Sequence, residues 1–410
     1  MLPCSVAPPA PTVKPATQLV RLGRESPFGD GFVNPPLQRG STVLHESVAD
    51  LRGRVARAIA GDDTGPVGYG IHGTSTHRAL QDALTELEGG YRSWVLPSGL
   101  TACTAAILAF VATGDHVLVP DSAYGPTRRF CTGMLARMGV ETSFYDPRSG
   151  AELAGQFRPN TRVLFLESPG SLTFEMQDVP LLAGLARSHG AVSVIDNTWA
   201  TPLYFQPLAH GVDVCVHAAT KYIGGHADLL MGTITTNEAA SGAVRAVIRT
   251  LGLTTSADDC WTALRGLRTM EARLQRHRAT AEALMDWLER QPEVARILYP
   301  AHPRDPGHAL WKRDFSGASG LFGIALQPQI PVAAANALVD GMRLFGCGYS
   351  WGGYESLILP CYPERSLPAA HPPSSLIRIS AGMEDPADLI HDLQGGFAQL
   401  RAAVIQEQRK

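Results

Sequence analysis

The chain has 410 residues, of which 45% are hydrophobic and 18% are charged. This composition is typical of a soluble globular protein with a sizeable core, and the length predicts two domains or one large domain with an appendage. The formal net charge of -3 gives no electrostatic basis for binding nucleic acid or an anionic membrane. No uninterrupted apolar run of about 18 residues is present, so we expect no membrane span.

The N-terminal stretch MLPCSVAPPAPTVKPATQ lacks the apolar segment of a signal peptide, and we expect a disordered lead-in there. The cysteines are scattered, odd in number and never spaced as CxxC. Such a distribution favours reduced thiols in a cytoplasmic protein and argues against a zinc site or a disulfide framework. They are Cys4, Cys103, Cys131, Cys215, Cys260, Cys347 and Cys361.

Residues 1–60 contain many prolines and glycines and few periodic elements, so we expect an extended N-terminal arm. Residues 75–90 follow with Leu80, Leu84 and Leu87 at helical spacing and a Gly-Gly stop, which predicts an amphipathic helix.

The middle of the chain alternates short β-branched runs with helical patterns. This alternation predicts an α/β fold with a mainly parallel sheet that helices cover on both faces. In such sheets, ligands bind beyond the carboxyl ends of the strands. The expected strands are 116–120, 161–167, 191–196, 213–218 and 232–236, and the expected helices are 98–112, 125–139 and 179–190.

A long helix is predicted at 256–294, where Leu264, Leu267, Met270 and Leu274 share one face. Beyond it, two further strands (320–326 and 375–380) and a closing helix (386–404) predict a smaller α+β unit. We therefore expect an arm (1–60), a large ligand-binding domain (61–255), and a linking helix with a small C-terminal domain (256–410).

The stretch HAATKYIGGHADLL (217–230) places a lysine in small and apolar surroundings. The chain otherwise prefers arginine strongly, which makes this lysine a candidate for chemistry. Lysine occurs only at Lys14, Lys221, Lys312 and Lys410.

Asp196 closes the predicted strand 191–196, and Lys221 follows the next strand. If these strands are neighbours, both side chains emerge at the same edge of the sheet. An aspartate near a lysine is more often a structural ion pair than a catalytic pair, so this proximity alone decides nothing.

A possible phosphate site strengthens the catalytic interpretation. The segment SGLT (98–101) precedes a predicted helix, and the free N–H groups of Gly99 and Leu100 would attract a phosphate. Thr220 offers a hydroxyl and Tyr124 an aromatic ring, although alone they would be assigned to capping and packing. A lysine, a carboxylate, a ring face and a phosphate cradle together are what pyridoxal phosphate requires.

With these residues, the chain resembles the Cys/Met-metabolism pyridoxal-phosphate enzymes from about residue 17 to 405. Within that family, GFVNPPLQRGSTVL (31–44), YGPTRRF (124–130) and SWGGYESLILP (350–360) are most similar to the bacterial cystathionine β-lyases. The motifs that carry the family resemblance are GYGIHGTSTHRALQDALTELEGG, VLPSGLTA, DSAYGPTRRF, LESPGS, VIDNTWATP and DVCVHAATKYIGGHADLLMG.

The resemblance implies a fold-type I, aspartate-aminotransferase-like architecture and a homotetramer of two tight dimers. Lys221 would then form a Schiff base with the cofactor and later carry the Cα proton. Asp196 would keep the pyridine nitrogen protonated, and Tyr124 would stack on the ring. Gly99, Leu100 and Thr220 would hold the phosphate, and Tyr69 would reach the phosphate and substrate of the adjacent subunit.

The resemblance also implies a substrate site for an amino acid. Arg378, in the predicted strand SLIRIS, would bind the α-carboxylate, because a planar guanidinium suits a carboxylate bidentately. Without the resemblance, a structural ion pair would be the ordinary interpretation of this arginine. Ser350 and Trp351 would lie near the substrate, with Trp351 on its distal side.

Three positions depart from the family pattern. Tyr69-Gly70-Ile71 replaces the usual Tyr-x-Arg, so the arginine for the neighbour's phosphate is missing, and His72 and Arg78 are candidate substitutes. The other two departures are Trp261, where a tyrosine is usual near the site mouth, and Ala218, where many relatives have a serine.

The expected activity is carbon–sulfur β-elimination, in which L-cystathionine yields homocysteine, pyruvate and ammonia. Alternatives within the family are a γ-lyase, a γ-synthase, or a cysteine or homocysteine desulfhydrase. A non-catalytic protein on the same fold is a further alternative. A dinucleotide-binding function is excluded because no G-x-G-x-x-G follows a predicted strand.

Overall fold

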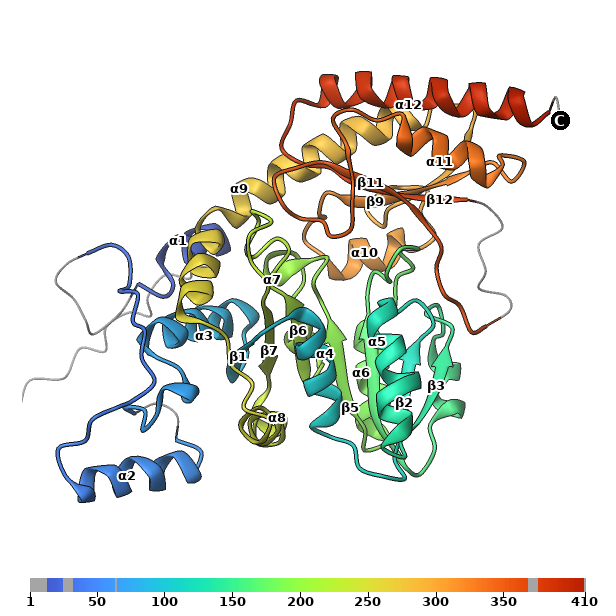
Figure 1. Ribbon diagram of the computed structural model, residues 1–410. Coiled ribbons are helices and arrows are strands. Elements are labelled where there is room, and N and C mark those ends of the chain that lie inside the picture. Colours follow the sequence, from blue (N-terminus) through green and yellow to red (C-terminus); the bar gives the residue numbers. More distant parts are fainter. Residues whose placement is uncertain (1–12, 25–31, 63–64, 368–374, 409–410) are drawn as a thin grey trace, which may run out of the picture.

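The computed structural model describes residues 13–24, 32–62, 65–367 and 375–408. It contains a seven-stranded and a five-stranded sheet, and Figure 1 shows the long helix α9 running from the first towards the second. Within the described residues, no helix is both long and apolar enough to cross a membrane.

The seven-stranded sheet has the order β1-β7-β6-β5-β4-β2-β3. Strand β7 runs antiparallel to both of its neighbours, and the other pairings are parallel. The prediction of a mainly parallel α/β fold is therefore confirmed. The strands are β1 (Arg92–Leu96), β2 (His116–Pro120), β3 (Glu141–Tyr145), β4 (Thr161–Glu167), β5 (Val192–Asp196), β6 (Val214–Ala218) and β7 (Gly232–Thr236).

Both faces of this sheet are covered, as alternate residues of β4 demonstrate. Val163 and Phe165 belong to a core that includes residues of α4 and α8. Leu164 and Leu166 belong to a second core that includes residues of α6. Burial on both faces explains the four consecutive apolar residues at the centre of β4 (163–166). The helices of this part are α3 (Ser75–Glu88), α4 (Gly99–Leu108), α5 (Gly125–Phe130), α6 (Val179–Ser188), α7 (Thr201–Tyr204) and α8 (Glu238–Thr250).

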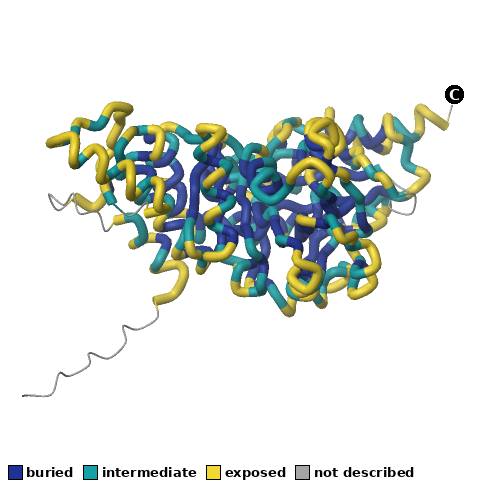
Figure 2. The backbone as a smooth tube through the Cα atoms, turned by 90° about the horizontal axis from the view of Figure 1, so that it is seen from below, coloured by how far each residue is buried: buried dark blue, intermediate teal, exposed yellow. Residues whose placement is uncertain are grey.

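The five-stranded sheet has the order β10-β11-β12-β9-β8. Its core is continuous with the α6 side of the first sheet, so one apolar cluster spans both sheets; Figure 2 shows buried backbone across the middle of the molecule. The elements are α9 (Ala257–Leu288), β8 (Val294–Leu298), α10 (His308–Asp314), β9 (Leu321–Leu326), α11 (Val332–Asp340), β10 (Gly346–Cys347), β11 (Leu357–Cys361), β12 (Leu376–Ser380) and α12 (Pro386–Glu407).

The expected helix at 125–139 is present, and α5 passes into a π-helical turn at Cys131–Leu135. Other expectations about local structure are wrong. The long helix α9 ends at Leu288 rather than at 294, where β8 already begins. The arm is not simply extended, since it contains the helices α1 (Pro15–Arg21) and α2 (Val48–Ile59). Helix α1 also overlaps the expected disordered lead-in, of which residues 1–12 lie outside the described residues. The remaining short helices are Gly70–His72, Ala151–Gln156 and Pro207–His210. The boundaries of the three predicted domains stay a prediction.

Candidate active site

A cavity of about 650 Å³ lies at the carboxyl ends of the parallel strands. Glu167, Asp196 and Ala218 end β4, β5 and β6, and all three line it. The cavity brings together all predicted site residues except Tyr69, which is 52% exposed and precedes the short helix Gly70–His72. Those in the cavity are Gly99, Leu100, Tyr124, Asp196, Thr220, Lys221, Ser350, Trp351 and Arg378.

Lys221 is placed by the tight turn that follows β6. Its backbone N–H donates to the carbonyl of Ala218 (3.0 Å), and its own carbonyl accepts from Gly225 (2.7 Å). The side-chain Nζ donates to Ser350 Oγ at 2.6 Å and lies 5.3 Å from the centre of the Trp351 ring. The amine therefore enters the cavity between the two sheets.

Burial lowers the pKa of Lys221 to about 8, and the nearby Arg378 adds to the effect, while Asp196 opposes it. A lysine acts as a nucleophile or base only as the uncharged amine. Near neutral pH this amine is uncharged more often than an exposed lysine, which suits it to attack an aldehyde.

We expect the titration of Lys221 to be directly visible by NMR. In protein freed of cofactor and labelled with ¹³C at lysine Cε, one resonance is expected to titrate with a midpoint near pH 8, because the folded pKa is about 8. Few signals will overlap, since the chain contains few lysines. Lys221→Met should remove this resonance. Persistence of the pH 8 titration in that variant would contradict the assignment.

Asp196 is oriented by Thr198, whose backbone N–H donates to Asp196 Oδ1 at 3.0 Å. The Thr198 hydroxyl also donates to Oδ1 and accepts from the backbone N–H of Ala218 at 2.9 Å. Asp196 pairs in register with Val216, so β5 and β6 are neighbours, which meets the condition for both side chains to emerge at one edge of the sheet. No ion pair joins Asp196 to Lys221 in the described part of the chain, so the carboxylate can serve a cationic pyridine nitrogen.

The start of α4 provides a cradle for a phosphate. Ser98 Oγ accepts from the backbone N–H of Thr101 at 3.1 Å, which leaves the first N–H groups of the helix for a ligand. A Cβ added to Gly99 would lie 2.5 Å from Ala218 Cβ. Only glycine therefore allows the helix to begin this close to β6, and the residues present fit a bound phosphate group.

Gly99→Ala is expected to weaken binding of pyridoxal phosphate about tenfold and to lower the free energy of unfolding by about 1–3 kcal/mol, as overpacking does. Both follow from the clash with Ala218. A fluorescence titration of cofactor-free protein and urea unfolding would measure these changes. Gly184→Ala in α6 is the matched control, since an added Cβ there meets nothing within 4 Å. Equal behaviour of the two variants would contradict the cradle.

Thr220 has a different contact from the one expected. Its Oγ1 accepts from the backbone N–H of Met231 at 3.0 Å and donates to the Met231 carbonyl at 3.3 Å. The hydroxyl thus connects the lysine turn to the segment before β7. Its role towards a phosphate stays a prediction.

Tyr124 precedes α5 and is 45% exposed, so its ring is accessible from the cavity. Its backbone N–H donates to Glu167 Oε2 at 2.7 Å. Sequence reasoning missed Glu167; the available signal was an acidic residue that closes an otherwise apolar strand. Burial raises the pKa of Glu167 well above its ordinary value, and the charge of Asp196 raises it further.

Arg378 lies on β12, is 8% exposed, and donates from Nη2 to the Ser350 carbonyl at 2.8 Å. Burial lowers its pKa. No carboxylate forms an ion pair with it within the ranges that the structure covers, so the structural interpretation is not supported. A buried guanidinium that faces a cavity without an anionic partner suits a substrate carboxylate.

Ser350 adopts a left-handed backbone conformation, with φ of 80°. Such a conformation is costly for a residue with a side chain and persists where the surroundings impose it. Here it accompanies the two contacts of Ser350, to Lys221 through Oγ and to Arg378 through the carbonyl. Trp351 packs against Tyr222, with ring centres 5.5 Å apart.

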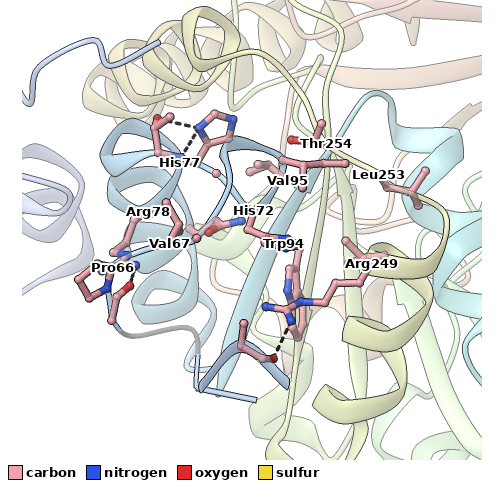
Figure 3. A pocket seen from close by; sticks show the side chains of 18 of the residues that line it. Pro66, Val67, His72, His77, Arg78, Trp94, Val95, Arg249, Leu253 and Thr254 are labelled. Carbon is pink, nitrogen blue, oxygen red and sulfur yellow. Dashed lines mark hydrogen bonds between the residues drawn. The ribbon is translucent and has the colours of Figure 1, made fainter. Parts of the chain in front are cut away.

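Two of the three departures from the family pattern, at Ile71 and at Trp261, lie away from this cavity, whereas Ala218 lines it. Ile71, His72 and Arg78 line a separate cavity of about 90 Å³, which Figure 3 shows. Arg78 Nη2 donates there to the Gly65 carbonyl at 2.7 Å. Trp261, on α9, donates from its indole N–H to the Pro35 carbonyl at 3.3 Å. Within one chain, none of Ile71, His72, Arg78 and Trp261 lines the Lys221 cavity.

The profile of the Cys/Met metabolism PLP-dependent enzymes matches residues 16–398. The chain belongs to this family. Its cofactor is therefore pyridoxal phosphate, as the sequence predicted.

The proteins to which this chain is similar are named for more than one enzymatic activity. Cystathionine beta-lyase MetC of Escherichia coli is 41% identical over 392 residues, covering 94% of this chain and 98% of the relative. An L-alanine/L-glutamate racemase of Wolbachia pipientis is 40% identical over 396 residues, covering 95% and 98%. The solved cystathionine gamma synthase of Xanthomonas oryzae pv. oryzae, in complex with aminoacrylate and cysteine, has a TM-score of 0.85 at 29% identity, covering 95% of this chain and 99% of that one.

Proposed function

We propose that the protein is a pyridoxal-phosphate-dependent carbon–sulfur β-lyase that cleaves L-cystathionine to homocysteine, pyruvate and ammonia. The observation that carries the proposal is that one cavity holds the buried amine of Lys221 and the buried guanidinium of Arg378, which has no ion-pair partner among the described residues. The similarity to a cystathionine β-lyase along almost the whole chain supports this choice within the family.

Four side chains of the cavity have a task in the proposed reaction. Pyridoxal phosphate supplies, when bound, an electron sink that acidifies the Cα–H bond of an attached amino acid. Lys221 removes the Cα proton, which requires the uncharged amine that burial favours. Arg378 orients the substrate through its α-carboxylate, and Asp196 would hold the pyridine nitrogen of the bound cofactor in its protonated form. The ring of Tyr124 covers one face of the site.

The bond that breaks is between Cβ and sulfur, and its electron pair leaves with the thiolate. The Cα–H electrons form the new Cα–Cβ double bond, and the released enamine reacts with water to give pyruvate and ammonia. A thiolate is a good leaving group, so deprotonation and orientation are the main demands on the protein. Both demands fall on Lys221 and Arg378.

The test is to incubate the purified protein with L-cystathionine and to identify the keto acid. Pyruvate with homocysteine is the expected result. Formation of 2-oxobutyrate with cysteine would instead identify a γ-lyase, and no keto acid with a colourless protein would indicate a non-catalytic protein. Formation of sulfide from cysteine or homocysteine would identify a desulfhydrase.

Amino-acid racemisation is a second candidate, favoured by the 40% identity to the Wolbachia racemase. It needs the same removal of the Cα proton, followed by its return to the opposite face. Chiral chromatography of L-alanine incubated with the protein would detect it. D-alanine formation faster than pyruvate release from L-cystathionine would make racemisation the main activity.

We further propose a cytoplasmic homotetramer in which Tyr69 reaches the site of an adjacent subunit. Two features support an assembly: Tyr69 is 52% exposed, and helix α2 has no buried residue. The same helix exposes Val48, Leu51, Val55 and Ile59 at helical spacing, an apolar stripe that a neighbouring subunit would cover. Light scattering on the eluted protein would give the mass; a monomer would contradict the proposal.

A further inference from the structure

A buried cluster of metal-ligating side chains lies on the strand that leads to Lys221, and the chemistry described above does not use it. Cys215 and His217 are alternate residues of β6, so both point to the same face of the sheet. Glu88 reaches this face as the last residue of α3. None of these three residues lines the Lys221 cavity.

The three side chains are close enough to share one ion. Each offers a ligand atom, and these atoms all lie within 4.8 Å of one another. His217 Nε2 is hydrogen-bonded to Glu88 Oε1 and lies 3.4 Å from Cys215 Sγ. Two ligand atoms about 2.0–2.3 Å from a tetrahedral zinc ion lie roughly 3.5 Å apart, so the imidazole and the thiol already have that spacing.

The hydrogen bonds within the cluster leave two buried oxygens unused. Glu88 is 1% exposed, and its Oε2 has no hydrogen-bond partner among the described residues. The side chain of Asn197 lies against Cys215, and its buried Oδ1 also lacks a donor in the part of the chain that the structure covers. Buried acceptors without a donor cost free energy, so both oxygens are suited to bind a cation at this point.

The ligands are held by regular structure. Strand β6 pairs with β5 on one side and β7 on the other, which fixes Cys215 and His217. The side-chain amide of Asn197 donates to the Phe205 carbonyl at 2.9 Å, and its backbone N–H donates to the Val216 carbonyl at 2.9 Å. Because the amide nitrogen is used in this way, Oδ1 is the atom that Asn197 turns to the cluster.

The types of donor indicate which ion fits. A thiolate, an imidazole and a carboxylate are all zinc ligands, whereas Mg²⁺ and Ca²⁺ prefer oxygen ligands alone. Burial raises the pKa of the Cys215 thiol well above its ordinary value, but a thiol that coordinates a metal loses its proton to solvent. The two charges of the ion then balance the thiolate and the carboxylate.

We propose that Glu88, Cys215 and His217 bind a zinc ion. Asn197 Oδ1 is the fourth ligand, and coordination replaces the direct hydrogen bond between Glu88 and His217. The ion joins the end of α3 to β6, the strand before the Lys221 turn. The prediction against a zinc site rested on the lack of CxxC spacing; a single cysteine is enough here because the fold brings three other residue types to it.

The test measures metal in the purified protein. Wild-type protein, produced in zinc-supplemented medium and purified without chelators, is expected to contain about one zinc per chain by elemental mass spectrometry. Cys215→Ser and His217→Gln should each lower this content about tenfold or more. Cys260→Ser is the matched control, because Cys260 is also fully buried but lies on α9, outside the cluster.

A second measurement needs no variant. Protein produced with cobalt in place of zinc is expected to show the red-light absorption of tetrahedral cobalt(II), a region in which pyridoxal phosphate does not absorb. Wild-type protein without bound zinc and without this absorption overturns the site, whether or not the variants fold.

Two outcomes with the variants would also overturn the site. Equal zinc in wild type, Cys215→Ser and His217→Gln would place the ion elsewhere. A tenfold loss of zinc in Cys260→Ser would show that any buried thiol has the same effect. The pyruvate assay is independent of the metal measurement, so the β-lyase function and the zinc site stand or fall separately.

Discussion

Replacing Lys221 with alanine is expected to lower kcat for pyruvate release from L-cystathionine by about 1,000-fold or more, within the range for loss of a general base. The Nζ of Lys221 is the only lysine amine lining the cavity among the described residues, so no neighbouring amine can substitute for it. The visible absorption of the bound cofactor should shift, because the variant lacks the amine that we propose as its covalent attachment point. Steady-state kinetics and an absorption spectrum of the reconstituted variant would measure both effects.

The control for this experiment is Lys312→Ala. Lys312 lies on α10 and is exposed to solvent, so its removal should leave both the rate and the spectrum of the wild-type protein. A Lys221→Ala protein with normal turnover would remove the basis of the proposed mechanism. A Lys221→Ala protein that is inactive but retains the wild-type spectrum would place the attachment point elsewhere.

Replacing Arg378 with methionine is expected to lower kcat/KM by about 30-fold or more, since truncating one partner of a buried charge pair costs about 2–5 kcal/mol. The buried guanidinium has no carboxylate partner in the described structure, so we expect a bound ligand to supply the negative charge that pairs with it. The increase in KM should be large for every amino-acid substrate, because the α-carboxylate is common to all of them. Arg378→Lys should recover only part of the activity, because an ammonium lacks the planar fork of donors.

Arg296→Met is the control for Arg378→Met, because Arg296 is an exposed arginine on β8 of the same sheet. Circular dichroism would verify that the Arg378 variants fold. A folded Arg378→Met protein with unchanged KM for L-cystathionine would show that the carboxylate binds elsewhere.

The fold class and most central strands could be predicted because a strand that is buried on both faces contains consecutive apolar residues, which are visible in the sequence. The strand 161–167 has four consecutive apolar residues at its centre, and the structure starts and ends β4 at the same residues. Strand β3 (Glu141–Tyr145) was not predicted, because it lies at the edge of the sheet and its first four residues are not buried. An edge strand with polar residues is formed by pairing with its neighbour and lacks an apolar pattern of its own.

The arm shows a different reason for a missed element. Helix α2 begins after Ser47, whose Oγ accepts from the backbone N–H of Asp50. This capping signal and the apolar stripe from Val48 to Ile59 were present in the sequence. The prediction of an extended arm instead followed from the many prolines and glycines in residues 1–60. The π-helical turn after α5 has no comparable signal, because an extra residue in a turn is decided by the packing of the helix.

The sequence by itself determined the chemistry of this protein. Its residue types and their order along the chain identified the family, the cofactor and a candidate lysine, because these depend on local motifs. Only the tertiary structure decided which distant side chains share the cavity. Lys221 meets Ser350 across 129 residues, and Arg129 meets Glu364 across 235. Such contacts depend on strand register and on how the second sheet packs against the first, and no local pattern of residues encodes either.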